Sequence, residues 1–349
     1  MTMQRRRDRM FLNTRFLINS ILACSLGLLS LSQAFADSDK KDRVLDTEAK
    51  KSSAAASQAP VIASIGPSDR PAMIQLTSDV KGKKNRPLML VLHGYNMDAQ
   101  SMNGFVQASA AASALNAFLI LPEGRKDLSG KRFWDATDAC CNFFSAKPAI
   151  SDEDYLVSLV KEAVEKYPVD RRNIYVVGFS NGGFMANRLA CNHSELFSGV
   201  ASLSGANYLN PAQCQPRQPI SMLQIHGTYD PLISFNGGTL VPSEPSFPRY
   251  PSAMQTTAFW AEHNKCKQQT FTAAADELSQ FNIDFLYQSV SDPAELANYL
   301  DIGNETDRID YFDCKRDEKV ALWIMNGLGH APFYKPDLLL KVIDFLEKP

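Results

Sequence analysis

The sequence predicts one large α/β domain, built on a mostly parallel sheet with helices on both of its faces. Two observations support this fold class. Short runs of apolar, often β-branched residues recur along the chain, and these runs are apolar at successive rather than alternate positions. Amphipathic segments separate the runs. Strands buried on both faces have the first pattern, and their alternation with helices is typical of a parallel sheet.

The predicted elements follow in order from residue 61. Residues 61–77, interrupted by Gly66 and Pro67, are expected to form an antiparallel hairpin at one edge of the sheet. Buried strands are predicted at residues 88–92, 117–121, 174–177, 200–203, 220–225 and 320–325. Helices are predicted at residues 153–166, 184–189, 252–263 and 338–346. The catalytic domain would therefore cover residues 61–349. Residues 270–313 are rich in Asp and Glu and weakly patterned, and we expect an inserted cap, lid or surface loop there.

The first 36 residues have the composition of an export signal. Arginines cluster between residues 5 and 15, residues 16–31 are largely apolar, and Ala34-Phe35-Ala36 has the pattern of a cleavage site. A membrane anchor is the alternative, but the apolar run is short for a spanning helix. Lipid attachment at Cys24 is a less favoured alternative. Residues 37–60 are expected to be a flexible tether. We therefore expect a secreted or periplasmic protein with no stable membrane span.

The net charge and the cysteines indicate which kinds of partner and which cellular compartment to expect. The chain has a net charge of −2 at pH 7, and its predicted leader is rich in arginine, so the remainder is more acidic. Nucleic acid is therefore not an expected partner. All but one of the seven cysteines lie beyond the leader, which indicates disulfides in an oxidising compartment. The sequence has no C-x-x-C pair that would indicate a metal site, and it implies no cofactor.

Residues 175–183, YVVGFSNGG, contain the spacing G-x-S-x-G around Ser180. This spacing is typical of a nucleophile elbow, a turn so tight that side chains at the two glycine positions would collide. An apolar strand is predicted before the turn and a helix after it, as an elbow requires. The alternative is a polar turn in which Ser180 only caps the helix. The context favours a nucleophile.

A serine nucleophile needs a histidine base and an acid that orients the histidine. Of the five histidines, only His330 follows a late predicted strand. Asp230 follows the strand at residues 220–225, between the serine and the histidine in the chain. The order serine, acid, histidine at the carboxyl ends of successive strands predicts a triad of Ser180, Asp230 and His330. Asp301, Asp310 and Asp313 are rivals for the acid by chain order alone.

The tetrahedral intermediate of such a reaction needs backbone donors for its oxyanion. One donor is expected to be the N–H of Asn181, the residue after the nucleophile. The second is expected directly after an early strand, which assigns the N–H of Tyr95 in the stretch Leu92-His93-Gly94-Tyr95. His93 and His226, each at the end of a predicted strand, are expected to be structural.

Several stretches together resemble a known family: VLHGYNMDAQSM, LPEGRKDLSGKRFWDATDACC, VVGFSNGGFMANRLAC, IHGTYDPLISFNGG and GLGH. The family is that of the bacterial polyhydroxybutyrate depolymerase and feruloyl esterase-like serine hydrolases, within the α/β-hydrolase superfamily. The resemblance covers most of the chain from Pro87 to His330. It implies an α/β-hydrolase fold, a carboxylic ester hydrolase that works through an acyl-enzyme, and the same three triad residues.

The sequence does not determine which ester is the substrate. The family commonly has a tryptophan shortly after its histidine, and Phe333 would take its place here. Phe133 and Trp134, with Phe143 and Phe144, are expected to form the wall of an acyl or aryl pocket, with loop packing as the alternative. Soluble or oligomeric hydroxyalkanoate, feruloyl or acetyl esters are the expected substrates. The alternatives are a serine peptidase of the prolyl-oligopeptidase type or a hydrolase fold kept as a binding module.

The positions of the cysteines suggest how they pair. A bridge from Cys266 to Cys314 would close both ends of the weakly patterned segment. Cys140 and Cys141 would then pair with Cys191 and Cys214, in either order. A bridge between the adjacent Cys140 and Cys141 is the less favoured alternative, because its small ring strains the peptide.

Overall fold

The computed structural model describes residues 60–77, 85–142, 150–284 and 305–347. These residues form a domain built on a ten-stranded sheet. The predicted leader and nearly all of the tether lie outside these residues. In spatial order the strands are β1 (Ile62–Ile65), β2 (Ala72–Gln75), β4 (Phe118–Leu121), β3 (Arg86–Leu92), β7 (Val169–Phe179), β8 (Gly199–Leu203), β9 (Ser221–Gly227), β15 (Val320–Met325), β14 (Thr306–Phe312) and β12 (Gln268–Asp276). The strands from β4 to β15 in this order run parallel, and the pairs beyond them at both edges run antiparallel.

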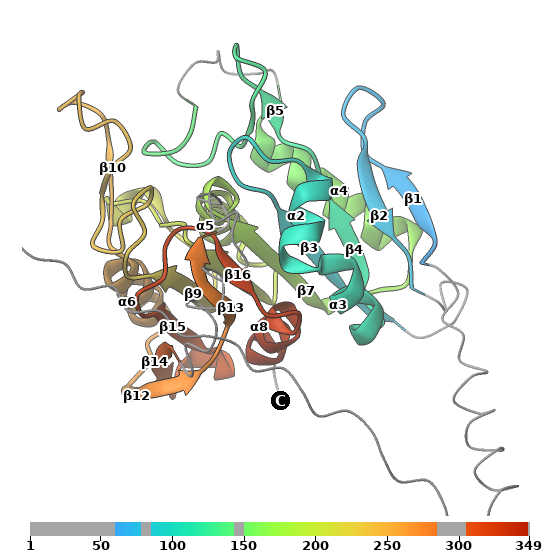
Figure 1. Cartoon of the computed structure of the whole chain (residues 1–349). Coiled ribbons are helices and arrows are strands. Elements are labelled where there is room, and N and C mark those ends of the chain that lie inside the picture. The colour runs from blue at the N-terminus through green and yellow to red at the C-terminus, as the bar shows by residue number, and fades with distance from the viewer. Residues whose placement is uncertain (1–59, 78–84, 143–149, 285–304, 348–349) are drawn as a thin grey trace, which may run out of the picture. The chain divides into compact units, whose positions relative to one another are not determined.

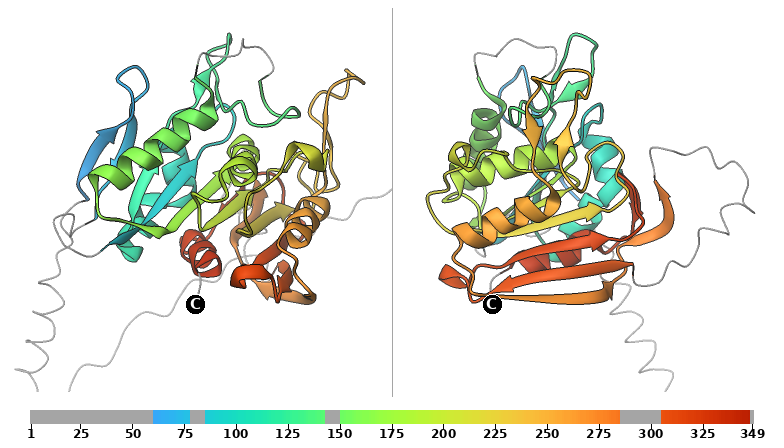
Figure 2. Two further views of the ribbon diagram at one scale, coloured as in Figure 1. Left: turned by 180° about the vertical axis from the view of Figure 1, so that it is seen from behind. Right: turned by 90° about the vertical axis from the view of Figure 1, so that its left-hand side faces the viewer.

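Helices cover both faces of the sheet (Figures 1 and 2). One face carries α4 (Asp152–Lys166), α5 (Asn181–His193) and α6 (Ala253–His263), and the other carries α2 (Ala99–Val106), α3 (Ala108–Leu115) and α8 (Leu338–Leu346). Each face has its own apolar core. In β3, Leu88 and Leu90 face one core, while Met89 and Val91 face the other. The predicted fold class is confirmed, since central strands buried on both faces need apolar residues at every position.

Local signals in the sequence set where several helices begin. The side chain of Ser151 accepts a hydrogen bond from the N–H of Asp154 at the start of α4. Ser252 and Gln255 form a reciprocal capping box at the start of α6. Such caps satisfy amide groups that have no partner within the helix. The predicted edge hairpin is also present, as β1 and β2.

The expectation of a cap, lid or loop at residues 270–313 is wrong for the described part of that segment. Strands β12 and β14 extend the main sheet, and β13 (Ser279–Asp284) pairs with β16 (Pro332–Tyr334). Residues 285–304 lie outside the described residues. The strand pattern was weak because β12, at the edge of the sheet, is exposed along most of its length. An edge strand of this kind needs no continuous apolar run.

The six cysteines in the described part of the chain pair in three bridges, one of which corrects the sequence prediction. Cys266 is joined to Cys314, as expected. Cys191 at the end of α5 lies beside Cys214, with their Cα atoms 4.8 Å apart, and these two form a bridge. Cys140 is therefore joined to Cys141, the pairing that the sequence disfavoured. The expectation failed because chain position did not reveal that Cys191 and Cys214 are neighbours in the fold.

Replacing Cys266 and Cys314 together by serine should lower the free energy of unfolding by about 4 kcal/mol, because their bridge constrains the unfolded chain. Urea unfolding of the oxidised protein measures this. The loop between Cys191 and Cys214 is shorter, 23 residues against 48, so the matching pair of serines there should cost roughly half a kcal/mol less. Peptide mapping that links Cys140 to Cys191 or Cys214 would contradict the pairing itself.

Candidate active site

Ser180 occupies a tight turn between the end of β7 and the start of α5 (Figure 1). Its backbone has φ 54° and ψ −120°, a strained conformation for a residue with a side chain, and its hydroxyl does not cap the helix. A Cβ atom at Gly178 would lie 2.0 Å from the Gly182 carbonyl oxygen, and one at Gly182 would lie 2.4 Å from that of Leu92. The two glycines are therefore required by close backbone approach.

The structure brings the three predicted triad residues together. The Ser180 hydroxyl lies 2.8 Å from His330 Nε2, and His330 Nδ1 lies 2.6 Å from Asp230 Oδ2. All three residues are buried. Because the carboxylate can only accept, His330 Nδ1 donates to it, which leaves Nε2 to accept the serine proton. This is the geometry of a nucleophile, a base and an orienting acid.

Asp230 is held in its ionised form by a complete set of donors. Its Oδ1 accepts from the N–H groups of Leu232 at 2.9 Å and Ile233 at 2.8 Å. Burial would raise the pKa of the carboxyl, but hydrogen bonds from His226 and His330 outweigh burial and hold the pKa well below its usual value. Asp230 is therefore an acceptor and not a proton donor. The rival acids Asp310 and Asp313 instead pair with Arg308 and Lys267, and Asp301 lies outside the described residues.

The role of His226 was underestimated from the sequence. Its Nε2 lies 3.2 Å from Asp230 Oδ2 and donates to the Ile233 carbonyl oxygen at 2.7 Å. The Gln224 side-chain amide donates to its Nδ1 at 3.2 Å, which fixes that tautomer. His226 is thus structural, as predicted, but what it supports is the carboxylate of Asp230. The sequence does not indicate this contact, because it depends on the shape of the turn after β9.

The loop that carries His330 is tied to the turn that carries Asp230. The N–H of Tyr229 donates to the Leu328 carbonyl oxygen at 3.0 Å, and the N–H of Gly327 donates to the Thr228 hydroxyl at 2.9 Å. The ring of Phe179, the residue before the nucleophile, lies 5.1 Å from the His330 ring between centroids. The base and the acid are therefore positioned as one unit.

His93 orients the peptide group predicted to supply the second oxyanion donor. The N–H of Gly124 donates to His93 Nε2 at 2.8 Å, so Nδ1 carries the proton and donates to the Gly94 carbonyl oxygen at 2.7 Å. The Gly94 carbonyl belongs to the same peptide as the Tyr95 N–H, and the two point in opposite directions because the peptide is trans. Burial lowers the pKa of His93 to about 4, which keeps the ring neutral. Asn181, the other predicted donor, is the first residue of α5.

The predicted aromatic wall is not formed by Phe133 and Trp134. Their side chains are 1% and 0% exposed, so neither borders an open pocket in this structure. They belong to a segment that is hydrogen-bonded to α5 through Trp134, and loop packing, the weaker expectation, describes both side chains. Phe333, on β16, is half-buried three residues after His330, and its contact with substrate stays a prediction. Phe143 and Phe144 lie outside the described residues.

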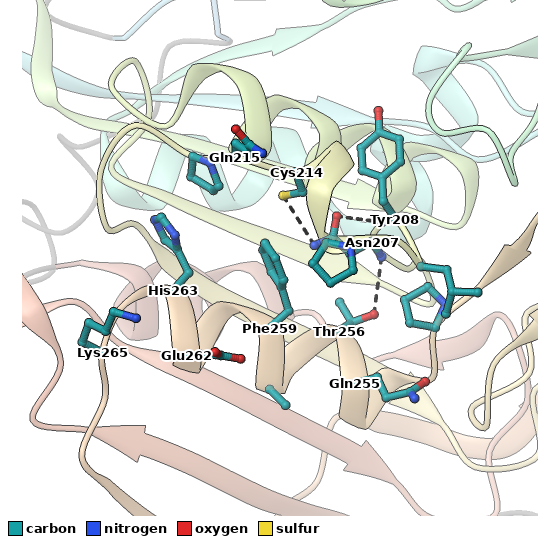
Figure 3. Close-up of a pocket in the computed structure, with 15 residues that line it drawn as sticks. Asn207, Tyr208, Cys214, Gln215, Gln255, Thr256, Phe259, Glu262, His263 and Lys265 are labelled. Carbon is teal, nitrogen blue, oxygen red and sulfur yellow. Dashed lines mark hydrogen bonds between the residues drawn. The ribbon is translucent and has the colours of Figure 1, made fainter.

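A groove of about 610 Å³ runs between α6 and the segment that follows β8 (Figure 3). Tyr208, Phe259 and His263 are among the residues that line it, and none of the three triad residues does. The groove is therefore a feature apart from the triad.

Among the helices of the described residues, none has the length and apolar content of a membrane span.

Comparisons with known proteins agree with this architecture. The model of the phospholipase/carboxylesterase family matches residues 78–243. Feruloyl esterase B of Piromyces equi is 24% identical over 267 residues, which cover 75% of this chain and 42% of that protein. The probable feruloyl esterase C of Aspergillus oryzae is 25% identical over 238 residues, 66% of this chain and 75% of that protein. The structure of an acetyl xylan esterase from Aspergillus awamori matches with a TM-score of 0.53 and 14% identity, over 82% of this chain and 98% of the other. Together with the sheet described above, these matches show that the chain has the fold of the α/β-hydrolase superfamily.

The predicted resemblance to an esterase family of that superfamily is confirmed by these matches. The likeness to polyhydroxybutyrate depolymerases stays a prediction. The chain spans less than half the length of the Piromyces protein, at 42%.

Gly178→Ala should destabilise the folded protein by about 3 kcal/mol or more, because the new methyl group would meet backbone atoms that cannot move independently. Gly104→Ala is the matched control. Gly104 lies within α2, has no neighbour within 4 Å of its Cβ position, and should gain roughly 0.5 to 1 kcal/mol from the same change. Urea unfolding compares the two. Equal effects would show that the elbow tolerates a side chain.

Burial of His93 should make stability depend on pH in a defined window. In the unfolded chain His93 binds a proton below about pH 6.5, whereas in the folded protein its pKa is about 4. The free energy of unfolding should therefore fall by about 2 to 3 kcal/mol as the pH is lowered from 6.5 to 4.5. Unfolding of the wild type and of His93→Gln at both pH values tests this. The slope should be smaller in the variant, and equal slopes would contradict the assignment.

Proposed function

We propose that this chain is a serine carboxylic-ester hydrolase that works through an acyl-enzyme. The observation that carries the proposal is a buried chain of hydrogen bonds. It starts at Ser180, in the turn between β7 and α5, and runs through His330 to Asp230. The esterase names of its relatives support the same reaction class. A serine peptidase shares the triad, but no observation favours it.

The geometry suggests a role for each residue. His330 Nε2 accepts the proton of the Ser180 hydroxyl as its oxygen attacks the ester carbonyl carbon. The oxyanion is received by the N–H groups of Asn181 and Tyr95. His330 then returns the proton to the departing alcohol, and a water molecule, activated by the same histidine, releases the acid and restores Ser180. Asp230 stays ionised throughout and stabilises the imidazolium.

The substrate class is proposed from chemistry and relatives together. Feruloyl and acetyl esters of plant polysaccharides fit the names of the relatives and of the acetyl xylan esterase whose fold is similar. Soluble hydroxyalkanoate oligomers are a further candidate. We also propose export through the cell membrane, because three disulfides fit an oxidising compartment. A panel of p-nitrophenyl acyl esters, methyl ferulate, acetylated xylan and hydroxybutyrate oligomers distinguishes these substrates.

Ser180→Ala and Asp230→Asn should each lower kcat for a p-nitrophenyl ester, the first by at least about a thousandfold and the second by on the order of 10³ to 10⁴. Asp310→Asn is the matched control, because Asp310 is a rival acid by chain order but pairs with Arg308 on β14. It should retain activity within about twofold. Retention of more than about a hundredth of kcat by Ser180→Ala would overturn the proposal.

A further inference from the structure

Asn181 makes a reciprocal pair of hydrogen bonds with the backbone of Trp134. Its side-chain oxygen accepts from the Trp134 N–H at 2.7 Å, and its side-chain nitrogen donates to the Trp134 carbonyl oxygen at 2.9 Å. Both residues are fully buried. Bonds of this kind are strong and directional when water is excluded. They fix the first residue of α5 against the segment at residues 134–136.

The side chain of Trp134 reaches the opposite side of the oxyanion site. Its indole N–H donates to the His93 carbonyl oxygen at 2.9 Å, and the two rings lie 4.9 Å apart between centroids. That carbonyl belongs to the peptide directly before the one that carries the Tyr95 N–H. His93 holds the second of these peptides through the Gly94 carbonyl oxygen. Trp134 thus contacts the elements that supply both proposed donors, Asn181 and Tyr95.

We infer that Trp134 is a positioning residue for the oxyanion hole, which it holds by joining the first turn of α5 to the end of β3. This inference rests on the proposed function. It replaces the expectation that Trp134 contacts substrate, since a side chain with no exposed surface cannot do so. The indole N–H and the Trp134 backbone together set the separation between two backbone donors that belong to different elements.

The separation of the two donors matters because the oxyanion is present only near the transition state. Donors stabilise it fully only at about 2.7 to 3.1 Å from its oxygen. A small change in their separation therefore weakens transition-state binding more than substrate binding. The expected signature is a lower kcat with little change in KM.

The segment that carries Trp134 has further anchors, so that loss of the indole bond should not release it. Arg188 of α5 donates to the carbonyl oxygens of Asp135 and Ala136, both at 2.9 Å. The N–H of Asp135 donates to the buried carboxylate of Asp152 at 2.7 Å. A phenylalanine at position 134 would keep the ring in the core and the two backbone bonds to Asn181.

Trp260 provides a matched control for the loss of an indole N–H. It is also fully buried, and its indole N–H donates to the Asn187 side-chain oxygen at 3.0 Å. Trp260 lies on α6, and its partner Asn187 is more than one and a half turns along α5 from Asn181. Trp260→Phe therefore removes one buried hydrogen bond from the same helix without touching the groups that Trp134 holds.

The experiment compares Trp134→Phe with Trp260→Phe. It measures kcat, KM and the affinity for a trifluoromethyl ketone, an inhibitor whose adduct with the serine places an oxyanion in the site. Trp134→Phe should lose about tenfold in kcat and in ketone affinity, with KM within about twofold. Trp260→Phe should keep all three values within about twofold. Equal losses in both variants, or a change in KM alone, would overturn the inference.

Asn181→Ala is the second variant, and it keeps the test decisive if Trp134→Phe does not fold. It retains the proposed backbone donor but loses both bonds to Trp134, so it should show the same fall in kcat and ketone affinity. Unchanged kcat and ketone affinity in Asn181→Ala would overturn the inference. Failure of the proposed function is distinguishable, because the wild type would then lack Ser180-dependent turnover altogether.

Discussion

The close approach of backbone at the β7–α5 turn is the constraint on which the site depends. Gly178 and Gly182 come so near to each other and to Leu92 that neither position has room for a Cβ atom. This contact presses the first turn of α5 against the end of β3. It thereby raises Ser180 out of the sheet and sets Asn181 opposite the residues that follow β3. Every other part of the site is arranged around that junction.

Two groups of hydrogen bonds extend from the junction in different directions. On one side, the turn after β9 and the loop after β15 are bonded to each other, so Asp230 and His330 are positioned together. On the other side, Trp134 and His93 hold the peptides expected to bind the oxyanion. In the proposed mechanism, the first group would govern proton transfer and the second would govern stabilisation of the oxyanion. The bonds of the second group are buried, which strengthens them and makes their loss costly, whereas the bond from Gly327 to Thr228 in the first group is exposed.

The sequence predicted most of the fold and the grouping of the triad, because both depend on local patterns. Apolar runs marked the buried strands, and the glycines around Ser180 marked a turn that few other residues could form. The edge strand β12 and its neighbour β14 were missed because partly exposed strands have no such pattern. The bridge between Cys140 and Cys141 was disfavoured because its small ring strains the peptide. The observation that favours it, the proximity of Cys191 and Cys214, is revealed only by the fold.

The buried tryptophan shows a second limit of reasoning from sequence. An aromatic residue in a polar stretch can equally well line a pocket or fill a core, and its neighbours in the chain do not distinguish the two. What decided the matter for Trp134 was its set of hydrogen bonds to Asn181 and His93, residues far away in sequence. Similarly, the support that His226 gives Asp230 depends on the shape of the turn between them.

The most direct measurement of the central claim is the reaction of the protein with a fluorophosphonate, followed by intact mass and peptide mapping. We expect one adduct per molecule, on the peptide that contains Ser180, and none in Ser180→Ala. Labelling should be at least about a hundredfold slower in His330→Gln, because the serine proton would have no acceptor. An unlabelled wild type, an adduct on another residue, or equally fast labelling without His330 would contradict the claim that Ser180 is an activated nucleophile.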